Sequence, residues 1–324
     1  MTVYYADDAL FDEADAYFGD SVQPDQLQPT PVNLVAQLSA PDRELRVIRL
    51  IQQAHDIYNT GLADHLDGHT LVASCLLFSG GNDSTTLGHI FKDRASHAIH
   101  ANTTIGIEQT RIFVRETCEA WGLPLIEKVA PVSFRELVIE RGFPGPAMHY
   151  KMYQRLKERC LDAARRDLVS DPRKERIVFI AGRRRQESAR RVAVPLSERD
   201  GSTIWVSPLA FWTSLDMMTY RSLNPDIPRN QASDTLHMSG ECLCGAFAHR
   251  GELDEIGYWY PEMKAEIEAL EAEVRAAGHK EPYCTWGHGQ GKPSEKSGPM
   301  CSSCDARFQQ TDQGVLNFDA KEAI

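Results

Sequence analysis

A short apolar run that ends at two glycines constrains the fold of this chain more than any other sequence feature. Residues 71–78 read LVASCLLF, which suits a strand buried on both faces of a sheet. The run stops at Ser79-Gly80-Gly81, and residues 85–91 then have a helical pattern. A buried strand, a glycine turn and a helix in this order are typical of α/β proteins.

The same alternation recurs along the next hundred residues. Its glycine-bounded joints predict an α/β fold with a Rossmann-like, doubly wound parallel sheet. Further strands are predicted at 98–103, 123–129 and 176–181, and helices at 44–66, 105–121, 134–141 and 149–168.

Composition divides the 324 residues into three parts. Residues 1–70 are acidic and then proline-rich, and are predicted to form a helical lead-in. Residues 71–225 carry the strand–helix alternation. Residues 226–324 hold five of the eight cysteines and one charged helix at 261–277, so they are predicted to be a small Cys-rich metal-binding region.

Charge and hydropathy narrow the function classes. The net charge of −11 argues against a protein that coats nucleic acid non-specifically. No apolar stretch is long enough to span a bilayer, and the acidic N-terminus lacks a signal-peptide pattern, so we expect a cytoplasmic protein with no membrane partner. Cysteines in that setting are expected to be thiols or metal ligands. Those outside the last part are predicted to be small buried hydrophobes: Cys75, Cys118 and Cys160.

The residues that join the first strand to its helix, Ser79-Gly80-Gly81-Asn82-Asp83-Ser84, have the chemistry of a phosphate site. The glycines can adopt positive φ and admit a ligand close to the backbone, and N–H groups at a helix N-terminus attract anions. Ser79 and Ser84 add hydroxyl groups, and Asp83 is suited to cap the helix or to hold Mg²⁺. An ordinary capped turn is the alternative.

The hexapeptide SGGNDS resembles the signature of PP-loop ATP pyrophosphatases, in particular the branch that contains phosphoadenosine phosphosulfate (PAPS) reductases. The resemblance implies that residues 71–225 form a nucleotide-binding domain whose residues 79–84 hold ATP or a sulfonucleotide. Members that use ATP cleave it between the α and β phosphates and so adenylate a substrate. A lysine is common in the family where this chain has Asn82.

Later segments extend the resemblance. Asn102 and Thr103 fall where the family has polar residues near the nucleotide, and residues 206–220 match a segment in which Trp212 and Tyr220 are expected to pack. The run GRRRQESARR resembles the reductase motif Gly-x-Arg-x-x-Glu-Ser-x-x-Arg, and arginine's planar fork suits phosphate and sulfate groups. A solvated basic run is the alternative. The residues that match the motif are Gly182, Arg184, Glu187, Ser188 and Arg191.

Two close cysteine pairs lie in the last third of the chain, Cys242-Leu243-Cys244 and Cys301-Ser302-Ser303-Cys304. Four thiolates on tight turns can complete a shell around one metal centre, and the spacing leaves zinc and iron–sulfur open. Cys284 is a fifth candidate, as a replacement ligand or a reactive thiol. The segment around Cys242 resembles that of DNA-phosphorothioation (DndC-like) proteins, and this likeness implies a [4Fe–4S] cluster, with zinc as the alternative.

The favoured function is an ATP pyrophosphatase that adenylates a substrate, with release of pyrophosphate, for sulfur transfer. One alternative is a sulfonucleotide (PAPS or adenylyl-sulfate) reductase in sulfate assimilation. That chemistry needs a reactive cysteine near the C-terminus, and none follows Cys304. The other alternative is a non-catalytic nucleotide- or nucleic-acid-binding module with structural zinc.

In the favoured reaction Asp83 with Mg²⁺, and Arg184 with Arg191, offset the charge that builds on the leaving pyrophosphate. Expected partners are the nucleotide, a small-molecule, tRNA or DNA acceptor, and a sulfur-donor protein, and an oligomer is left open. The basic face of the helix predicted at 149–168, which includes Lys157, is expected to lie mainly in solvent rather than on nucleic acid.

Overall fold

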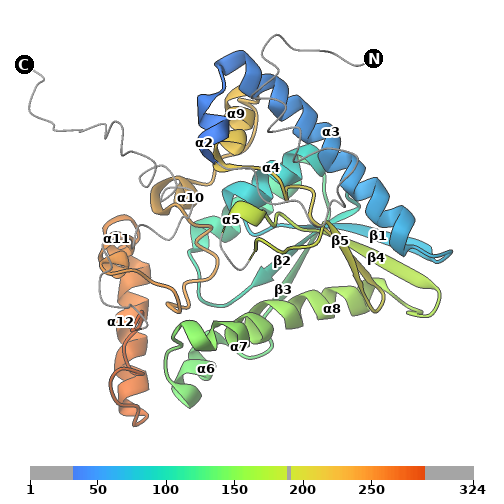
Figure 1. The fold of residues 1–324 in the computed structure, drawn as a ribbon. Helices are drawn as coiled ribbons and strands as arrows, with labels where there is room; N and C mark the ends of the chain where they lie inside the picture. The colour runs from blue at the N-terminus through green and yellow to red at the C-terminus, as the bar shows by residue number, and fades with distance from the viewer. Residues whose placement is uncertain (1–31, 188–190, 289–324) are drawn as a thin grey trace, which may run out of the picture.

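The computed structural model describes residues 32–187 and 191–288, and is built around one six-stranded sheet (Figure 1). The strand order is β3-β2-β1-β4-β6-β5, and every neighbouring pair is parallel except β5 with β6. The strands are β1 (Thr70–Leu77), β2 (His97–Asn102), β3 (Leu125–Val129), β4 (Glu175–Ile180), β5 (Ser197–Asp200) and β6 (Thr203–Val206). The expected α/β fold with a doubly wound parallel sheet is confirmed. β5 and β6 are not among the predicted strands, and β5 adds an antiparallel edge.

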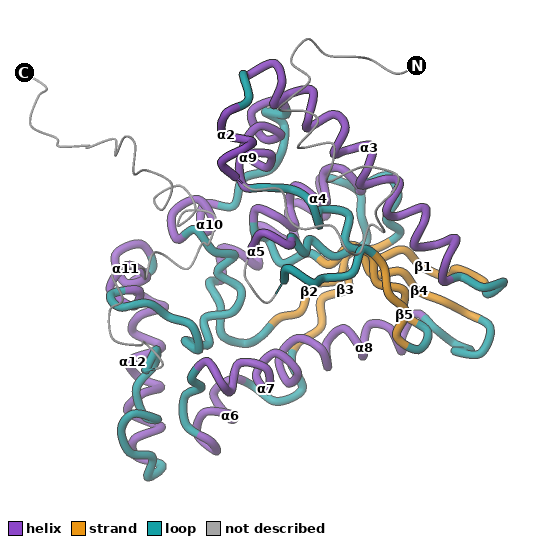
Figure 2. Tube along the Cα trace, viewed as in Figure 1, coloured by secondary structure: helices purple, strands orange, loops and turns teal. Residues whose placement is uncertain are grey.

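Helices cover both faces of the sheet (Figures 1 and 2). One face carries α3 (Ala40–His65), α4 (Asn82–Phe91), α5 (Glu108–Ala120) and α9 (Ser214–Leu223), with α2 (Val32–Gln37) beside α9. The other carries α6 (Phe134–Arg141), α7 (His149–Tyr153) and α8 (Arg159–Leu168). The remaining helices are α10 (Gln231–Leu236), α11 (Glu252–Trp259) and α12 (Pro261–Ala276). Within residues 32–187 and 191–288, none of these helices has the length and apolar character needed to cross a membrane.

Successive side chains of β1 pack into two different hydrophobic cores, one on each face of the sheet. Leu76 and Phe78 belong to the cluster that α3 and α4 bury, whereas Ala73 and Cys75 pack with Leu161 of α8. Successive side chains of a strand point to opposite faces, so an uninterrupted apolar run is what a doubly covered strand requires. The three cysteines that the sequence places in cores are buried as expected: Cys75, Cys118 and Cys160.

The helix predicted at 105–121 begins later, at Glu108. The preceding residues pair instead with a distant segment, because the Ile107 amide donates to the Gly240 carbonyl at 2.8 Å and the Leu243 amide donates to the Ile105 carbonyl at 2.9 Å. The helix predicted at 149–168 is interrupted by a π-helical turn, Gln154–Glu158. Both departures depend on tertiary contacts that a local pattern does not contain.

Residues 236–286 pack against α6 and the π turn. Leu236, Leu243 and Trp286 share one buried cluster with Phe134 of α6 and Leu156 of the π turn. The indole Nε1 of Trp286 also donates to the Leu243 carbonyl at 2.8 Å. The cysteine-bearing segment is therefore held from both sides.

Chain direction across the sheet changes next to β1. The chain steps from β1 to β2 and β3 on one side, and then crosses to β4 on the other side. Ligands in open α/β sheets bind at the carboxyl ends of the strands where the order reverses in this way. The loops that follow β1 and β4 meet at that point, so the fold places residues 79–84 beside residues 181–187.

A buried ion pair fixes α9 against α3. Arg46 donates through Nε to Asp216 Oδ1 at 2.9 Å and through a terminal nitrogen to Oδ2 at 3.3 Å. Asp216 also closes a capping box with Thr213 at the start of α9. Trp212 and Tyr220, which flank this pair, are buried as the sequence predicts for packing residues.

We expect Asp216→Ala to lower the free energy of unfolding by about 3–5 kcal/mol, because it removes a buried carboxylate that pairs with Arg46 and caps α9. Glu44→Ala, at an exposed position of α3, should change stability by less than about 0.5 kcal/mol. Urea denaturation followed by circular dichroism measures both. A loss below about 1 kcal/mol for Asp216→Ala would show that the pair does not hold the two helices together.

Candidate functional site

The loop after β1 uses both glycines to turn the chain into α4. Gly80 has φ 76°, and a Cβ there would lie 3.0 Å from side-chain carbons of Thr110 and Val114. Gly81 is the N-cap of α4, and a Cβ on it would lie 3.0 Å from the Ser239 Cβ. Any side chain at these two positions would push apart the loop and its neighbours, so close packing requires glycine here.

The first turn of α4 offers hydrogen-bond donors to a ligand. The amide of Thr85 makes the first backbone bond of the helix, to the Gly81 carbonyl at 2.9 Å, which leaves the three preceding N–H groups without an acceptor inside the helix. Ser84 Oγ donates to the Gly81 carbonyl at 3.0 Å and lies 3.2 Å from Ser79 Oγ. Free N–H groups, two hydroxyls and the positive end of the helix dipole together suit an anion.

Residues at the start of α10 hold the loop from behind. Asn230 Nδ2 donates to the Gly80 carbonyl at 2.8 Å and also lies 3.2 Å from Thr110 Oγ1. Ser233 Oγ donates to the same carbonyl at 3.3 Å. The Gly80 carbonyl is thereby occupied by hydrogen bonds from Asn230 and Ser233, and the amides of α4 are the groups left to bind a ligand.

The segment after β4 runs directly against the loop. A Cβ added at Gly182 would lie 3.4 Å from the Ser84 amide nitrogen, in ordinary van der Waals contact, so the two backbone segments run side by side here. Arg184 is only 4% exposed, and its Nε donates to Asp83 Oδ2 at 2.6 Å. The structure thus brings Asp83, Ser84, Gly182 and Arg184 together, as the proposed nucleotide site requires.

Glu187 and Arg191 form an ion pair at the same edge. Burial raises the pKa of Glu187, and nearby Asp83 adds to the rise although Arg191 opposes it. Two further arginines of the run make contacts within the fold, and Arg190 lies outside the described residues. Arg183 donates to Ser207 and Glu198, whereas Arg185 is fully buried against the Phe211 ring. Ser188 lies outside the described residues.

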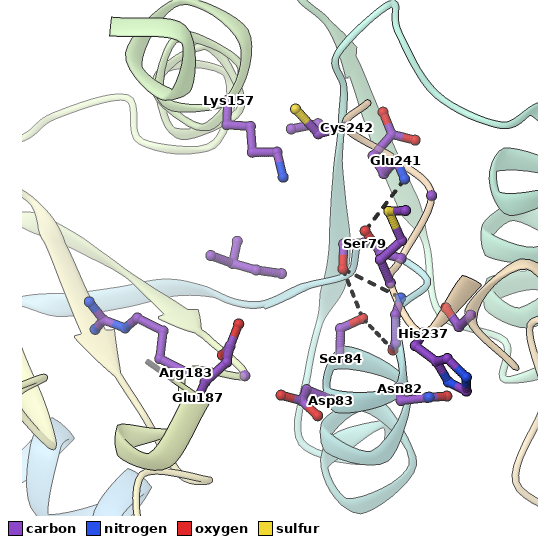
Figure 3. Close-up of a pocket in the computed structure, with 18 of the residues that line it drawn as sticks. Ser79, Asn82, Asp83, Ser84, Lys157, Arg183, Glu187, His237, Glu241 and Cys242 are labelled. Carbon is purple, nitrogen blue, oxygen red and sulfur yellow. Dashed lines mark hydrogen bonds between the residues drawn. The ribbon is translucent and has the colours of Figure 1, made fainter. Parts of the chain in front are cut away.

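The loop after β1 and the segment after β4 border a cavity of about 690 Å³ (Figure 3). Its wall continues from the loop, through the arginine segment and the π turn, to residues 237–248. Lys157 reaches into it from the π turn (Figure 3). Burial disfavours the charge of Lys157, but the neighbouring Cys242 and Glu241 outweigh burial and raise its pKa. One cavity therefore joins the anion-binding loop to the first cysteine pair.

Asn102 and Thr103 do not line this cavity. Asn102 Nδ2 donates to Glu127 Oε1 at 3.0 Å, and its own Oδ1 accepts from the Thr104 amide at 3.0 Å. The Thr103 amide donates to Glu241 Oε1 at 2.8 Å. In this structure both side chains hold protein segments together, and neither faces the space beside residues 79–84.

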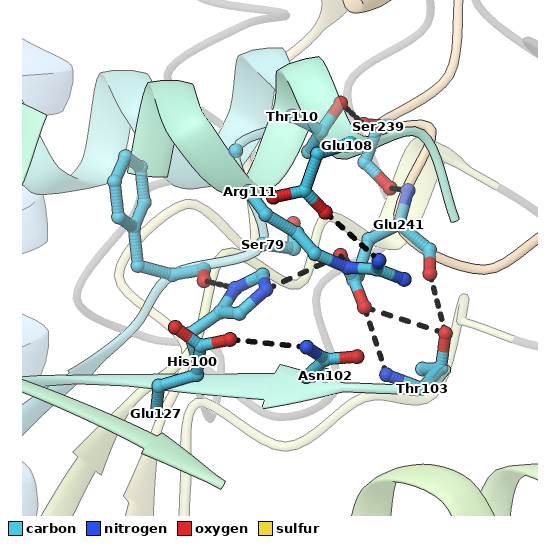
Figure 4. A network of polar contacts seen from close by, with 12 residues as sticks. Ser79, His100, Asn102, Thr103, Glu108, Thr110, Arg111, Glu127, Ser239 and Glu241 are labelled. Carbon is cyan, nitrogen blue, oxygen red and sulfur yellow. Dashed lines mark hydrogen bonds and ion pairs between the residues drawn. The ribbon is translucent and has the colours of Figure 1, made fainter. Parts of the chain in front are cut away.

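Glu241 is the centre of a buried polar network (Figure 4). Its side chain is 1% exposed, and Oε2 lies 3.2 Å from His100 Nε2 and 3.7 Å from Arg111 Nε. His100 Nδ1 lies 2.8 Å from the Phe78 carbonyl, to which it donates. At Gly106 a Cβ would lie 2.6 Å from the Glu241 carbonyl oxygen, so only glycine admits this segment at the end of β2.

Two of the five candidate metal ligands border the cavity, Cys242 and Cys244. A hydrogen bond from the Cys244 thiol lowers the pKa of Cys242 to about 6 against the effect of burial, and Lys157 adds to the fall. The same hydrogen bond raises the pKa of Cys244. Cys242 therefore has the lower pKa of the two thiols. The thiolate, which forms when a thiol loses its proton, is the form that binds metals.

The other three cysteines are not brought to this place. The Cys284 thiol lies 3.2 Å from Glu281 Oε1, and Cys284 does not line the cavity. Cys301 and Cys304 lie outside the described residues. Within residues 32–187 and 191–288, no three or more His, Cys, Asp or Glu side chains are grouped so that they could hold a metal ion.

The sequence patterns did not single out three residues that the structure places at the site. Lys157 was expected in solvent, but the π turn directs it into the cavity, and π turns are frequent at functional sites. Arg221 of α9 and Asn230 of α10 reach the loop from elements more than a hundred residues away. No local pattern carries such contacts.

We expect the Glu127 carboxyl to titrate far below its usual range. The Arg115 guanidinium, followed by the Asn102 amide, holds the pKa of Glu127 at about 2, so its contribution to stability is full above the unfolded value of about 4.3 and is lost as the pH falls towards 2. Arg115→Ala should raise this pKa by at least about 1 unit. Carboxyl NMR titration measures it, with Glu136 as the unchanged control. A normal Glu127 pKa in the wild type would contradict the role given to Asn102.

Comparison with known proteins agrees with this geometry. Residues 73–231 match the family model of the phosphoadenosine phosphosulfate reductase domain. No curated protein matches the chain in sequence. Among solved structures, the phosphoadenylyl-sulfate (PAPS) reductase of Candida auris is 15% identical with a TM-score of 0.38, and covers 72% of this chain and 94% of its own.

Two further structures are similarly distant. The FMN adenylyltransferase of Candida glabrata, in complex with FAD and pyrophosphate, is 9% identical over 70% of this chain and 68% of its own, with a TM-score of 0.43. The U34-tRNA thiolase NcsA of Methanococcus maripaludis, with its [4Fe-4S] cluster, is 13% identical over 84% and 90%, with a TM-score of 0.39. The assignment rests on the family match and on the site. Residues 73–231 of this chain form a phosphoadenosine phosphosulfate reductase domain.

Proposed function

We propose that this protein binds ATP on residues 79–84, cleaves it between the α and β phosphates, and adenylates a substrate for sulfur transfer. The observation that carries the proposal is the single cavity that joins the N-terminus of α4 to Cys242. An anion-binding loop at one end and a thiol with a lowered pKa at the other suit a reaction in which a nucleotide activates an acceptor for sulfur.

The charged groups of the site support phosphoryl chemistry. A substrate oxygen attacks the α-phosphorus, the bond to the bridging oxygen breaks, and pyrophosphate leaves with the added negative charge. The amides of α4 and the guanidinium of Arg184 bind that charge, with Arg191 nearby. Asp83 borders the cavity and would help hold Mg²⁺, which neutralises charge on the phosphates.

The first cysteine pair fits part of a metal shell. Cys242 and Cys244 lie two residues apart at the cavity edge, outside any helix or strand, and the pKa of Cys242 is lowered. We propose that they hold a [4Fe–4S] cluster with Cys301 and Cys304, with zinc as the alternative. Such a cluster supplies sulfur-binding or redox chemistry beside the activated substrate. The acceptor is proposed to be a small molecule, a tRNA or DNA, with a separate protein as sulfur donor.

Turnover of ATP is the test of the reaction. We expect AMP and pyrophosphate from labelled ATP and Mg²⁺ when the correct acceptor is present among tRNA, DNA and sulfate. Arg184→Ala should lower the rate by about 100-fold or more, because it removes a positioned donor to the developing charge. Arg199→Ala, at an exposed position of β5 that does not line the cavity, should stay within about two-fold. Formation of ADP alone, or no turnover with any acceptor, would refute the proposal.

Metal content tests the cysteine assignment. Protein purified without oxygen should be brown and hold about four irons and four sulfides per chain. Cys242→Ser and Cys244→Ser should each lose the colour and most of the iron. Cys284→Ser should keep both, because its thiol faces Glu281. A colourless protein that contains zinc would contradict the cluster and indicate a structural zinc site. Loss of iron in Cys284→Ser would show that Cys284 is a ligand.

A further inference from the structure

Arg221 is a cation that reaches the loop from another element. It lies on α9, which packs beside α4 through a 2.7 Å hydrogen bond between His89 Nδ1 and the Tyr220 hydroxyl. A terminal nitrogen of Arg221 donates to Asn82 Oδ1, and the side chain borders the cavity while remaining 14% exposed. Asn82 is the first residue of α4, so this contact places the guanidinium at the helix N-terminus.

The guanidinium is only partly satisfied by the described protein. Its second terminal nitrogen is buried, makes no hydrogen bond within residues 32–187 and 191–288, and is 3.7 Å from Asp234 Oδ1. Asp234 is already shared, because Arg229 donates to its other oxygen at 3.0 Å. A buried donor without an acceptor is costly, and a ligand oxygen at this place would remove the cost.

Residues 79–84 contain no lysine or arginine. The amides of α4 carry only partial charge, whereas a pyrophosphate carries several full negative charges, so a cation beside these amides strengthens anion binding. Of the two arginines that approach the loop, Arg184 is engaged by Asp83. Arg221 donates a hydrogen bond to the neutral amide of Asn82, and its ion pair with Asp234 is long, at 3.7 Å, so its charge is only partly compensated.

We propose that Asn82 and Arg221 act as a pair, in which Asn82 orients the Arg221 guanidinium to bind the pyrophosphate part of the nucleotide. The inference rests on the proposed nucleotide site. The cation that the loop lacks is supplied by α9, and Asn82 is the acceptor that keeps it in place. A positive charge at residue 82 itself should therefore replace Arg221.

Binding of pyrophosphate and of AMP, each with Mg²⁺, is measured by isothermal titration calorimetry with the full chain. Arg221→Gln should weaken pyrophosphate binding by about 10- to 100-fold, the loss typical of one charge-assisted hydrogen bond. AMP binding should change by less than about three-fold, because AMP lacks the group that Arg221 binds. Asn82→Ala should weaken pyrophosphate binding in the same direction by a smaller factor.

Two variants separate binding from folding. In Arg221→Gln, the added change Asn82→Lys should restore pyrophosphate binding to within about five-fold of the wild type, since it returns a cation to the same place. Arg94→Ala removes an exposed charge beyond the other end of α4, away from the cavity, and should alter pyrophosphate binding by less than about three-fold. Thermal unfolding curves identify any variant that fails to fold, and the Asn82→Ala variant then carries the test.

The outcomes are distinct. Wild-type affinity in Arg221→Gln, failure of Asn82→Lys to rescue it, or equal losses for AMP and pyrophosphate would each overturn the inference. A wild-type protein that binds neither ligand would refute the proposed nucleotide site instead. Binding by the wild type without any AMP formation from ATP would refute the proposed reaction and leave the role of Arg221 standing.

Discussion

The attachment of residues 239–244 to the end of β2 is the contact on which the rest of the site depends. Glu241 is buried between His100, Thr103 and Arg111, and the backbone of this segment pairs with residues 105 and 107. A carboxylate removed from water is stable only when charged and polar partners surround it, so the contact is specific to this arrangement. Gly106 completes it, because a side chain there would collide with the Glu241 carbonyl. Without this attachment the cysteine pair would have no fixed position relative to the loop.

The fold explains why the loop itself is where it is. The chain reverses its direction across the sheet between β1 and β4, and the two loops that leave these strands share one edge. The second loop runs against the backbone of the first at Gly182, and Arg184 reaches Asp83. The helices α9 and α10 add Arg221 and Asn230 from outside the sheet. The site is thus assembled at one edge of the sheet from the two loops, from α9 and α10, from the π turn and from residues 237–248.

Sequence patterns predicted the sheet, the loop and the arginine segment well, because each is local. An apolar run with glycines at its end is sufficient to place β1 and α4, and the motif around Arg184 follows β4 directly. Patterns failed where distant contacts decide the outcome. Asn102 looks like a ligand residue but binds Glu127, and Lys157 looks solvated but enters the cavity through a π turn. The late start of α5 has the same origin, since residues before it pair with the Glu241 segment.

The central claim is that the N-terminus of α4 holds the phosphates of a nucleotide whose reactive end faces the cysteine pair. A crystal structure with Mg²⁺ and an ATP analogue that cannot be cleaved between the α and β phosphates tests it most directly. The β and γ phosphates should lie on the amides of residues 82–84, with a nitrogen of Arg221 in hydrogen-bond range. The α-phosphate should lie on the side of the cavity that leads to Lys157 and Cys242. Phosphates bound away from residues 79–84, or a nucleotide outside this cavity, would contradict the account.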